Sequence, residues 1–327
     1  MLKFQIKTPT IGLGCWAIGG NFFGTDGKVT GYSGAKDEES IRAIQRAIEL
    51  GVKVFDTADY YGCGHSEELL GKTLADSRKE FTIISKFGNT FDIATKHGIG
   101  TDASPKYIRT ALADSLKRLK TDYLDIYLLH LWDYPADAGQ PVMDTLDDLV
   151  IEGKIRGYGW STDSTSRAKT YASRENYVAI ESELNLFKDT HEIVALCEKE
   201  RLLNLIRTPL AMGLLGGKYT RESQLPSDDI RTASPEWIAY FKNGQPTPGF
   251  LQKLESVKQI LTEDGRTVAQ GALGWILART PNAVILPGFK NARQVEENIT
   301  TLKYGALKPS QMKAIDDIMG SRLTNYE

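Results

Sequence analysis

The feature of this sequence that most restricts its fold is an eightfold alternation between short apolar segments and helical patterns. The apolar segments, rich in β-branched residues, occupy residues 10–16, 53–57, 81–86, 123–130, 155–160, 178–182, 203–208 and 283–286. Strands that read as nearly continuous apolar runs are typical of parallel sheets covered on both faces. Eight strand–helix units without a second pattern favour a closed (β/α)8 TIM barrel, and an open, doubly wound α/β sheet is the alternative.

The helical segments between these strands carry start and stop signals. Asp37 stands where a helix N-cap is expected, isoleucines then recur at helical spacing, and Gly51 follows the last turn. Ser104 followed by Pro105 predicts another helix start, because proline is tolerated at the first helical position. The chain therefore provides the helices that a barrel of parallel strands needs.

No linker-like stretch divides the chain, so residues 1–327 are predicted to form one domain. A TIM barrel needs only ~250 residues. Most of the excess lies in residues 21–36, which hold four glycines, and in residues 209–249, which hold five prolines and several aromatic residues. Long loops in compact domains are usually functional. We expect both loops to lie over the active-site face, the second as a lid.

Composition excludes several classes of protein. The chain has 40 Lys and Arg against 42 Asp and Glu, and this near balance gives no basic field for nucleic acid. No apolar run approaches the ~20 residues of a membrane helix, and the first residues lack the apolar core of a signal peptide. The cysteines at 15, 63 and 197 are too scattered for disulfides or zinc. We expect a cytoplasmic protein, monomeric or weakly oligomeric, without a metal.

Four proton-active residues follow the predicted second, third and fourth strands. Asp56 and Lys86 end two of these strands, His130 ends the third, and Tyr61 lies in the loop after Asp56. Barrel enzymes carry their working residues at the carboxyl ends of strands. A tyrosine is a poor acid unless a cation stabilises its phenolate, and Lys86 next to Asp56 supplies one. This group could protonate a carbonyl oxygen or perform the reverse reaction.

The same residues stand in an ordered set of motifs. Residues 56–62 read Asp-Thr-Ala-Asp-Tyr-Tyr-Gly, and residues 64–71 continue with Gly-His-Ser-Glu-Glu-Leu-Leu-Gly. Lys86 follows the segment FTIIS, and His130 follows DIYLL. This pattern, spread over nearly the whole chain, resembles the aldo-keto reductase superfamily, in particular its bacterial-type branch. The resemblance implies a barrel that binds a nicotinamide dinucleotide, usually NADPH, with Tyr61 as general acid supported by Asp56, Lys86 and His130.

The resemblance also implies which residues hold the nicotinamide. Ser161 matches the family's carboxamide-binding serine, whereas Thr162 and Glu181 replace the family's usual asparagine and glutamine. Glu181 accepts hydrogen bonds but cannot donate them when ionised, and its charge would favour the oxidised, cationic nicotinamide. Arg207 replaces a stacking tyrosine, and a planar guanidinium can also stack.

Two further segments match the family's phosphate-binding loops. Residues 213–218 (GLLGGK) resemble the pyrophosphate loop, and residues 287–291 (PGFKN) resemble the segment that binds the adenosine 2′-phosphate. Lys290 suits that phosphate, so NADP(H) is favoured and NAD(H) is the alternative. The remaining residues that the resemblance assigns to the cofactor are Trp16, Asp56, Pro209, Leu210, Gly213, Leu215, Lys218, Gly288, Gln294, Glu297 and Asn298.

The function that these residues predict is reversible hydride transfer between NADP(H) and a small aldehyde or ketone, with Tyr61 handling the proton. Trp132, together with Tyr61 and His130, is expected to line the substrate pocket, although simple packing of Trp132 is an equal alternative. One competing hypothesis is a non-catalytic, nicotinamide-binding regulatory subunit that resembles potassium-channel β subunits. A barrel hydrolase or isomerase without nicotinamide is another.

Overall fold

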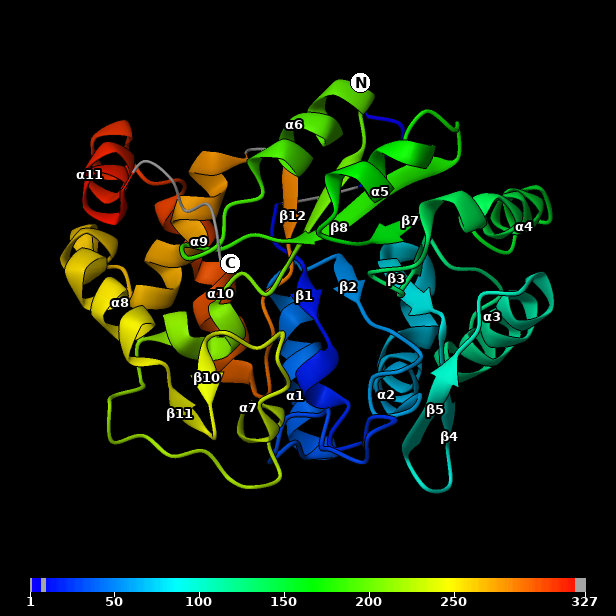
Figure 1. Cartoon of the computed structure of the whole chain (residues 1–327), viewed down its shortest axis with the longest axis horizontal. Coiled ribbons are helices and arrows are strands. Elements are labelled where there is room, and N and C mark those ends of the chain that lie inside the picture. Colours follow the sequence, from blue (N-terminus) through cyan, green and yellow to red (C-terminus); the bar gives the residue numbers. More distant parts are fainter. Residues whose placement is uncertain (1, 7–9, 281, 321–327) are drawn as a thin grey trace.

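Eight parallel strands form the centre of the computed structural model, which describes residues 2–6, 10–280 and 282–320 (Figure 1). Each strand pairs with the next one along the chain. In this order the strands are β1 (Leu13–Gly14), β2 (Val54–Asp56), β3 (Thr82–Phe87), β6 (Ile126–Leu129), β7 (Tyr158–Ser161), β8 (Tyr177–Glu183), β9 (Leu203–Arg207) and β12 (Ala283–Ile285).

The last strand returns to the first and closes the sheet. Parallel bridges join Ile11 to Ile285 and Gly14 to Gly288. The Gly12 N–H donates to the carbonyl of Ile285 at 2.9 Å, and the Ile285 N–H donates to the carbonyl of Thr10 at 2.7 Å. The predicted single-domain (β/α)8 barrel is therefore confirmed, and the open-sheet alternative is wrong.

Helices surround this barrel, with α8, α9 and α11 on one side and α3 and α4 on the other (Figure 1). Side-chain caps explain several of their starts: Ser104 accepts from the Tyr107 N–H ahead of α3, and Thr267 and Gln270 form a capping box at α9. The helices are α1 (Asp37–Glu49), α2 (His65–Leu74), α3 (Pro105–Leu119), α4 (Gln140–Ile151), α5 (Thr165–Tyr171), α6 (His191–Glu200), α7 (Ile230–Ala233), α8 (Pro248–Leu261), α9 (Val268–Arg279), α10 (Ala292–Tyr304) and α11 (Pro309–Met319).

Side chains fill the barrel, so it is a packed core and not a pore. A buried inner cluster includes Val54, Ile84, Leu128 and Leu205, while a larger cluster lies between strands and helices. Packing of the strands is tight at Gly159, where an added Cβ would lie 1.9 Å from the carbonyl oxygen of Ala179. The rigid sheet fixes the strand ends from which the candidate site is built.

The structure differs from the sequence-based prediction in a few elements. The first strand covers only Leu13–Gly14, and Trp16 instead begins a short 3-10 helix. Lys36, and not Asp37, occupies the N-cap of α1, so Asp37 lies in the first turn, where its charge suits the helix dipole. The prediction also omitted α8 and a hairpin of β4 (Asn89–Asp92) and β5 (His97–Thr101), whose half-exposed residues show little apolar alternation.

The two long loops contact each other directly. The Ile230 N–H donates to the carbonyl of Gly31, and both the N–H and the hydroxyl of Ser33 donate to the Asp229 carboxylate. The second loop also carries α7 and a small hairpin of β10 (Phe241–Lys242) and β11 (Gln245–Pro246), which lie along the lower edge of the view in Figure 1. Among the described residues, no helix combines the length and apolar character needed to span a membrane.

Candidate active site

The four proton-active residues meet at the carboxyl ends of β2, β3 and β6. The ammonium of Lys86 donates to Asp56 Oδ1 at 2.6 Å and to the Thr57 carbonyl at 2.9 Å, and its Nζ lies 3.3 Å from the Tyr61 hydroxyl. The rings of Tyr61 and His130 meet edge to face, 5.7 Å apart. Residues predicted from strand ends are thus brought into one cluster.

A second carboxylate contacts the same lysine. Glu181 on β8 places Oε2 at 3.3 Å from Lys86 Nζ, and neither side chain is more than 1% exposed. Burial acts to lower the pKa of Lys86, but Asp56 and Glu181 outweigh it and raise the pKa above its ordinary value. Burial, followed by the charge of Glu181, raises the pKa of Asp56 to about 8, with Lys86 acting in the opposite direction. The lysine therefore stays charged.

Tyr61 and His130 are both held in their neutral forms. Burial raises the pKa of Tyr61, although the charge of Lys86 opposes this effect. Burial, Lys86 and Arg207 together lower the pKa of His130 well below its usual value. Within the described part of the chain, His130 Nδ1 is buried and has no hydrogen-bond partner. A phenol and a neutral imidazole with unused hydrogen-bonding capacity suit a polar substrate atom.

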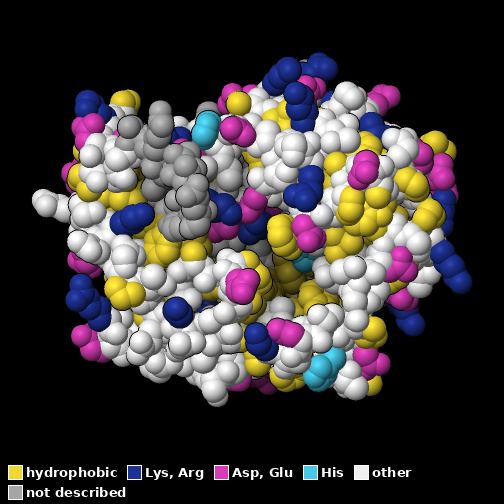
Figure 2. Space-filling model, in the orientation of Figure 1, with side chains coloured by type: hydrophobic (Ala, Val, Ile, Leu, Met, Phe, Trp, Pro, Cys, Tyr) yellow, Lys and Arg dark blue, Asp and Glu magenta, His cyan; other side chains and the backbone are white. Residues whose placement is uncertain are grey.

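Aromatic side chains extend from the cluster toward the surface. The Trp16 ring stacks on Tyr61 at 5.9 Å and on Trp237, from the second long loop, at 6.2 Å. Trp132 and Trp237 are 65% and 60% exposed. Figure 2 shows a hollow in this face of the molecule where hydrophobic side chains gather. These residues give the approach to the cluster partly apolar walls.

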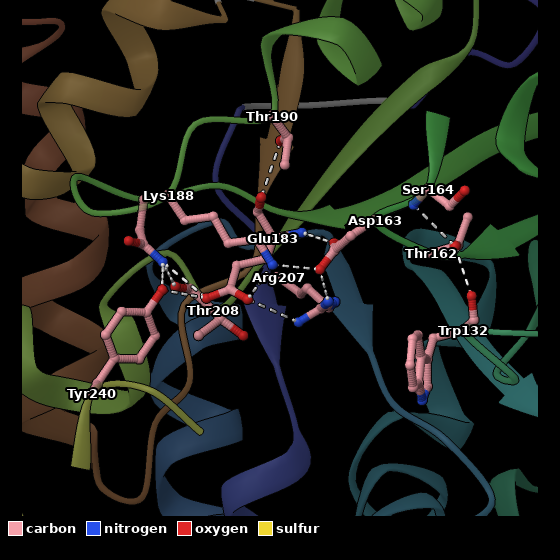
Figure 3. Close-up of polar contacts among 11 residues, drawn as sticks. Trp132, Thr162, Asp163, Ser164, Glu183, Lys188, Thr190, Arg207, Thr208 and Tyr240 are labelled. Carbon is pink, nitrogen blue, oxygen red and sulfur yellow. Dashed lines mark hydrogen bonds and ion pairs between the residues drawn. The ribbon is translucent and has the colours of Figure 1, made fainter. Parts of the chain in front are cut away.

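The residues that the resemblance assigns to the nicotinamide lie on β7, β8 and β9 and just beyond β7. Ser161 ends β7, is buried, and pairs with Glu181 across the sheet. The Thr162 hydroxyl donates to the Trp132 carbonyl at 2.8 Å and accepts from the Ser164 N–H at 3.2 Å (Figure 3). Its only hydrogen is thus already donated, which leaves a lone pair for any other contact.

Arg207 belongs to a network of four charged side chains (Figure 3). Its guanidinium donates to Asp163 Oδ2 at 2.7 Å and lies 3.6 Å from Glu183 Oε2. Lys188 bridges the same two carboxylates at 2.7 and 3.1 Å, and the hydroxyl of Tyr240 donates to Glu183. Two cations and two carboxylates balance, so the network holds Arg207 in place at no net charge.

Cations gather around Tyr32 at the predicted phosphate end. The Lys290 Nζ and the Arg231 Cζ lie 5.6 and 5.0 Å from the Tyr32 ring centroid, and Lys290 also donates to the Ser33 carbonyl. Burial, and then the charge of Arg231, lowers the pKa of Lys290 to about 8. Lys218 is exposed and adds to this lowering of the pKa. Burial and neighbouring cations disfavour the charged form of a lysine, and a bound anion would stabilise that charged form.

The segment before α10 is held by its own hydrogen bonds. Asn291 caps α10 by accepting from the Gln294 N–H at 3.0 Å, while Gln294 Oε1 accepts from the Lys290 N–H at 2.8 Å. Asn298 donates to the Gly288 carbonyl at 3.4 Å. Glu297 is half-buried. Among the other predicted residues, Pro209 and Leu215 are buried, Leu210 is half-buried, and Gly213 has a φ of 95°, which a residue with a Cβ rarely adopts.

Several residues of the site escape prediction from the sequence. The Arg231 guanidinium donates two hydrogen bonds to the Asp229 carboxylate and one to the Tyr219 hydroxyl at 2.8 Å, but these residues lie in the second long loop, whose single-turn helix α7 is too short to show a period in the sequence. Nothing in the sequence spacing indicates that Glu181 reaches Lys86, because β3 and β8 are far apart along the chain. The described residues include no group of three metal-ligating side chains.

Fold and site together define a class: a (β/α)8 barrel whose strand ends hold a tyrosine, a lysine, an aspartate and a histidine in contact, beside a cluster of cations. Comparison with known proteins gives the family. The model of the aldo/keto reductase family matches residues 10–319, and the chain belongs to this family.

Individual relatives are similar to this protein over nearly its full length. Aldo-keto reductase YhdN of Bacillus subtilis is 30% identical, covering 98% of this chain and 88% of its own length. The structure of a glycerol dehydrogenase from Gluconobacter oxydans has a TM-score of 0.79 at 28% identity and covers 98% of this chain and 95% of that one. The NADH-specific methylglyoxal reductase of Escherichia coli is 28% identical over 91% of each chain. The protein is accordingly an oxidoreductase of this family.

Proposed function

We propose that this protein transfers a hydride between NADP(H) and a small aldehyde or ketone, or the corresponding alcohol, with Tyr61 as the general acid or base. The observation that carries the proposal is the contact of the Tyr61 hydroxyl with Lys86 Nζ at 3.3 Å, while Asp56 holds that ammonium at 2.6 Å. A cation at this distance stabilises the phenolate that remains when the tyrosine gives up its proton.

The chain has residues that fit the phosphates of NADP(H). Lys290, with its pKa lowered to about 8 by burial and by Arg231, would keep its charge to higher pH beside a bound anion. Lys290 would hold the 2′-phosphate, the loop from Gly213 to Lys218 would hold the pyrophosphate, and Gln294, Glu297 and Asn298 would face the adenine end. The E. coli relative is NADH-specific, so the choice of NADP(H) rests on this cluster of cations.

The site also has polar groups for the nicotinamide end. Ser161 and Glu181 would hold the carboxamide, with Arg207 beside the ring; the bound nicotinamide supplies or accepts the hydride. Trp16, Trp132 and Trp237 would surround the substrate, and the loops at 21–36 and 209–249 would cover the site. Partly apolar walls of this kind exclude water and strengthen the electrostatic effect of Lys86.

The proton chemistry belongs to the chain's own residues. In reduction, Tyr61 donates its hydroxyl proton to the substrate oxygen, and the charge of Lys86 stabilises the phenolate as it forms. Because the pKa of Tyr61 is raised by burial, the tyrosine is protonated before substrate arrives, as the acid must be. His130, neutral because burial lowers its pKa, can donate a second hydrogen bond to the same oxygen and so fix its position.

The test is to follow the absorbance of NADPH and NADH in purified protein with a panel of carbonyl compounds that includes methylglyoxal, and of NADP⁺ with alcohols that include glycerol. Replacement Tyr61→Phe should lower turnover by about 10²- to 10⁴-fold. Tyr60→Phe is the matched control, because the Tyr60 ring packs edge to face on Phe22 and is not among the described contacts of Lys86 Nζ; this variant should retain turnover.

Three results would contradict the proposal in different ways. Full turnover in Tyr61→Phe would remove Tyr61 from its role. Tight NADPH binding without turnover on any compound would favour the regulatory-subunit alternative. Absence of any nicotinamide binding in a fluorescence titration would favour a barrel enzyme with another chemistry.

A further inference from the structure

Lys86 is the only described cation in the structure that two nearly inaccessible carboxylates contact within 3.5 Å. Asp56 lies 2.6 Å and Glu181 3.3 Å from its Nζ, and the three side chains are 5%, 1% and 0% exposed for Asp56, Glu181 and Lys86. They come from β2, β8 and β3, so the rigid barrel, and not a flexible loop, fixes their separation.

The charges of this cluster do not balance if every group takes its ordinary form. One ammonium faces two carboxylates, and its polar neighbours Tyr61 and His130 are neutral. A net negative charge in a desolvated site is costly, and two carboxylates that share a site cannot both ionise easily. The arrangement therefore favours one additional proton bound between Asp56 and Glu181.

We propose that Asp56, Lys86 and Glu181 form a proton store that returns to Tyr61 the proton given to the substrate oxygen. In these proton transfers, apart from its proposed contact with the carboxamide, Glu181 is a positioning residue: it acts through Lys86 and Asp56, and its charge is what keeps the extra proton in the cluster. The inference deepens the proposed function and rests on it, because the store is useful only if Tyr61 is the acid.

The proton transfers balance. In reduction, the O–H bond of Tyr61 breaks and an O–H bond forms on the substrate oxygen. The phenolate takes a proton from the Lys86 ammonium, and the resulting amine takes a proton from the carboxylic acid of Asp56. Tyr61 and the ammonium are thereby restored and both carboxylates are ionised. Before the next turnover the cluster takes up one proton from the solvent, either from hydronium or from water with release of hydroxide. Oxidation of an alcohol runs the same transfers in reverse.

Three titratable groups beside the cluster, Cys15, Tyr61 and His130, have pKa values displaced away from neutral pH. Burial raises the pKa values of Cys15 and Tyr61, and burial lowers that of His130 well below its usual value. Asp56 is the exception, with its pKa raised to about 8 by burial and by Glu181. The charged and titratable groups that face the cluster are Cys15, Asp56, Asp59, Tyr61, Lys86, His130, Glu181 and Arg207.

Infrared difference spectroscopy of the unliganded protein tests the store without reference to activity. Exposed carboxyls have lost their protons by about pH 6, so a carboxylic acid C=O band that disappears with a midpoint near pH 8 is expected from Asp56. In Glu181→Gln the midpoint should fall by at least about one pH unit. Glu181→Asp keeps the charge and should keep a step at a raised pH.

Two comparisons make the assignment specific. Asp59 is also buried with its pKa raised, but it is present in every variant and cancels in the difference between wild type and Glu181→Gln. Glu183→Gln removes a carboxylate from the same strand, one that contacts Arg207 and Lys188 instead of Lys86, and should leave the step unchanged. Circular dichroism establishes that each variant is folded.

The outcomes separate this inference from the proposed function. A wild-type protein without a carboxylic acid step, or a step unchanged in Glu181→Gln, overturns the store even if Tyr61 proves to be the acid. A step whose midpoint falls in Glu181→Gln supports it, and the limb near pH 8 in the pH profile of turnover should then move to lower pH in the same variant. If no carbonyl or alcohol reacts at all, the infrared result still reports the store, while the proposed function fails on its own test.

Discussion

Replacing Lys86 by methionine should reveal how much the lysine stabilises the fold as well as the reaction. Methionine fills a similar volume but removes the cation, so Asp56 and Glu181 lose the charge that both of them contact. Breaking a buried ion pair by removing one partner costs about 3–5 kcal/mol, because the remaining charge is left without compensation. We expect Lys86→Met to lose that much stability at neutral pH, along with turnover.

The size of the effect converts into a measurable melting temperature. An unfolding entropy of roughly 2.1 cal/mol/K per residue gives about 0.7 kcal/mol/K for 327 residues. The expected loss of Tm is therefore ~4–7 °C, read by calorimetry or circular dichroism. Lys313→Met is the matched control: its ion pair with Asp317 is exposed, is worth at most about 1 kcal/mol, and should change Tm by less than ~1.5 °C.

The loss of stability in Lys86→Met should also depend on pH. Burial and Glu181 already raise the folded pKa of Asp56, and Lys86 opposes them, so the variant's Asp56 holds its proton still more tightly. The pKa of Asp56 is thus higher in the folded than in the unfolded protein, where it is about 4. Protonated Asp56 therefore contributes its full stability below pH ~4, and this contribution is lost as the pH rises toward the folded-state pKa. The Tm deficit should thus be larger at pH 9 than at pH 5. An equal deficit at both pH values, or none, would refute the reasoning.

Two further substitutions test the cofactor end and the barrel. Lys290→Met should weaken NADPH binding by roughly 10- to 100-fold, the worth of a charge-assisted hydrogen bond. It should leave NADH binding unchanged, and fluorescence titrations measure both. Because burial and Arg231 lower the pKa of Lys290 to about 8, the preference of the wild type for NADPH should shrink as the pH rises above 8. Gly159→Ala should lower the free energy of unfolding by about 3 kcal/mol or more, since the new Cβ would lie 1.9 Å from the Ala179 carbonyl oxygen; Gly249→Ala in α8, with nothing within 4 Å of its Cβ, should not.

The parts of the molecule that could be predicted share one physical cause. A strand buried on both faces must be apolar, so a polar residue at its end, such as Asp56 or Lys86, stands out against the run before it. Because this signal recurs on neighbouring strands, both the barrel and the cluster of polar strand ends could be predicted from it. The strand ends converge because parallel strands share one direction, and this convergence needs no knowledge of side-chain conformations.

The parts that could not be predicted depend on contacts across the barrel or between loops. Glu181 reaches Lys86 only because side chains of β3 and β8 meet inside the barrel. The distance between the two residues along the sequence does not indicate this contact. Arg231 meets Lys290 and Tyr32 through two irregular loops whose course is set by hydrogen bonds such as those of Ser33 to Asp229. Such segments have no period of 2 or 3.6 that would disclose which face is buried.

Glu181, at a position where the resemblance implies an amide, shows that a motif can define the type of reaction while a single side chain outside the motif changes its energetics. Tyr61, Lys86, Asp56 and His130 suffice to define an acid and its supporting charge. A single carboxylate on Lys86 would leave the pair neutral, whereas the second one, when both are ionised, leaves the cluster with one negative charge in excess. That charge can be offset by a proton or by a cationic ligand, and the two compete for the same place. A rise in pH, which removes the proton, should therefore tighten binding of the cationic NADP⁺ relative to neutral-ringed NADPH, and so move the reaction toward oxidation.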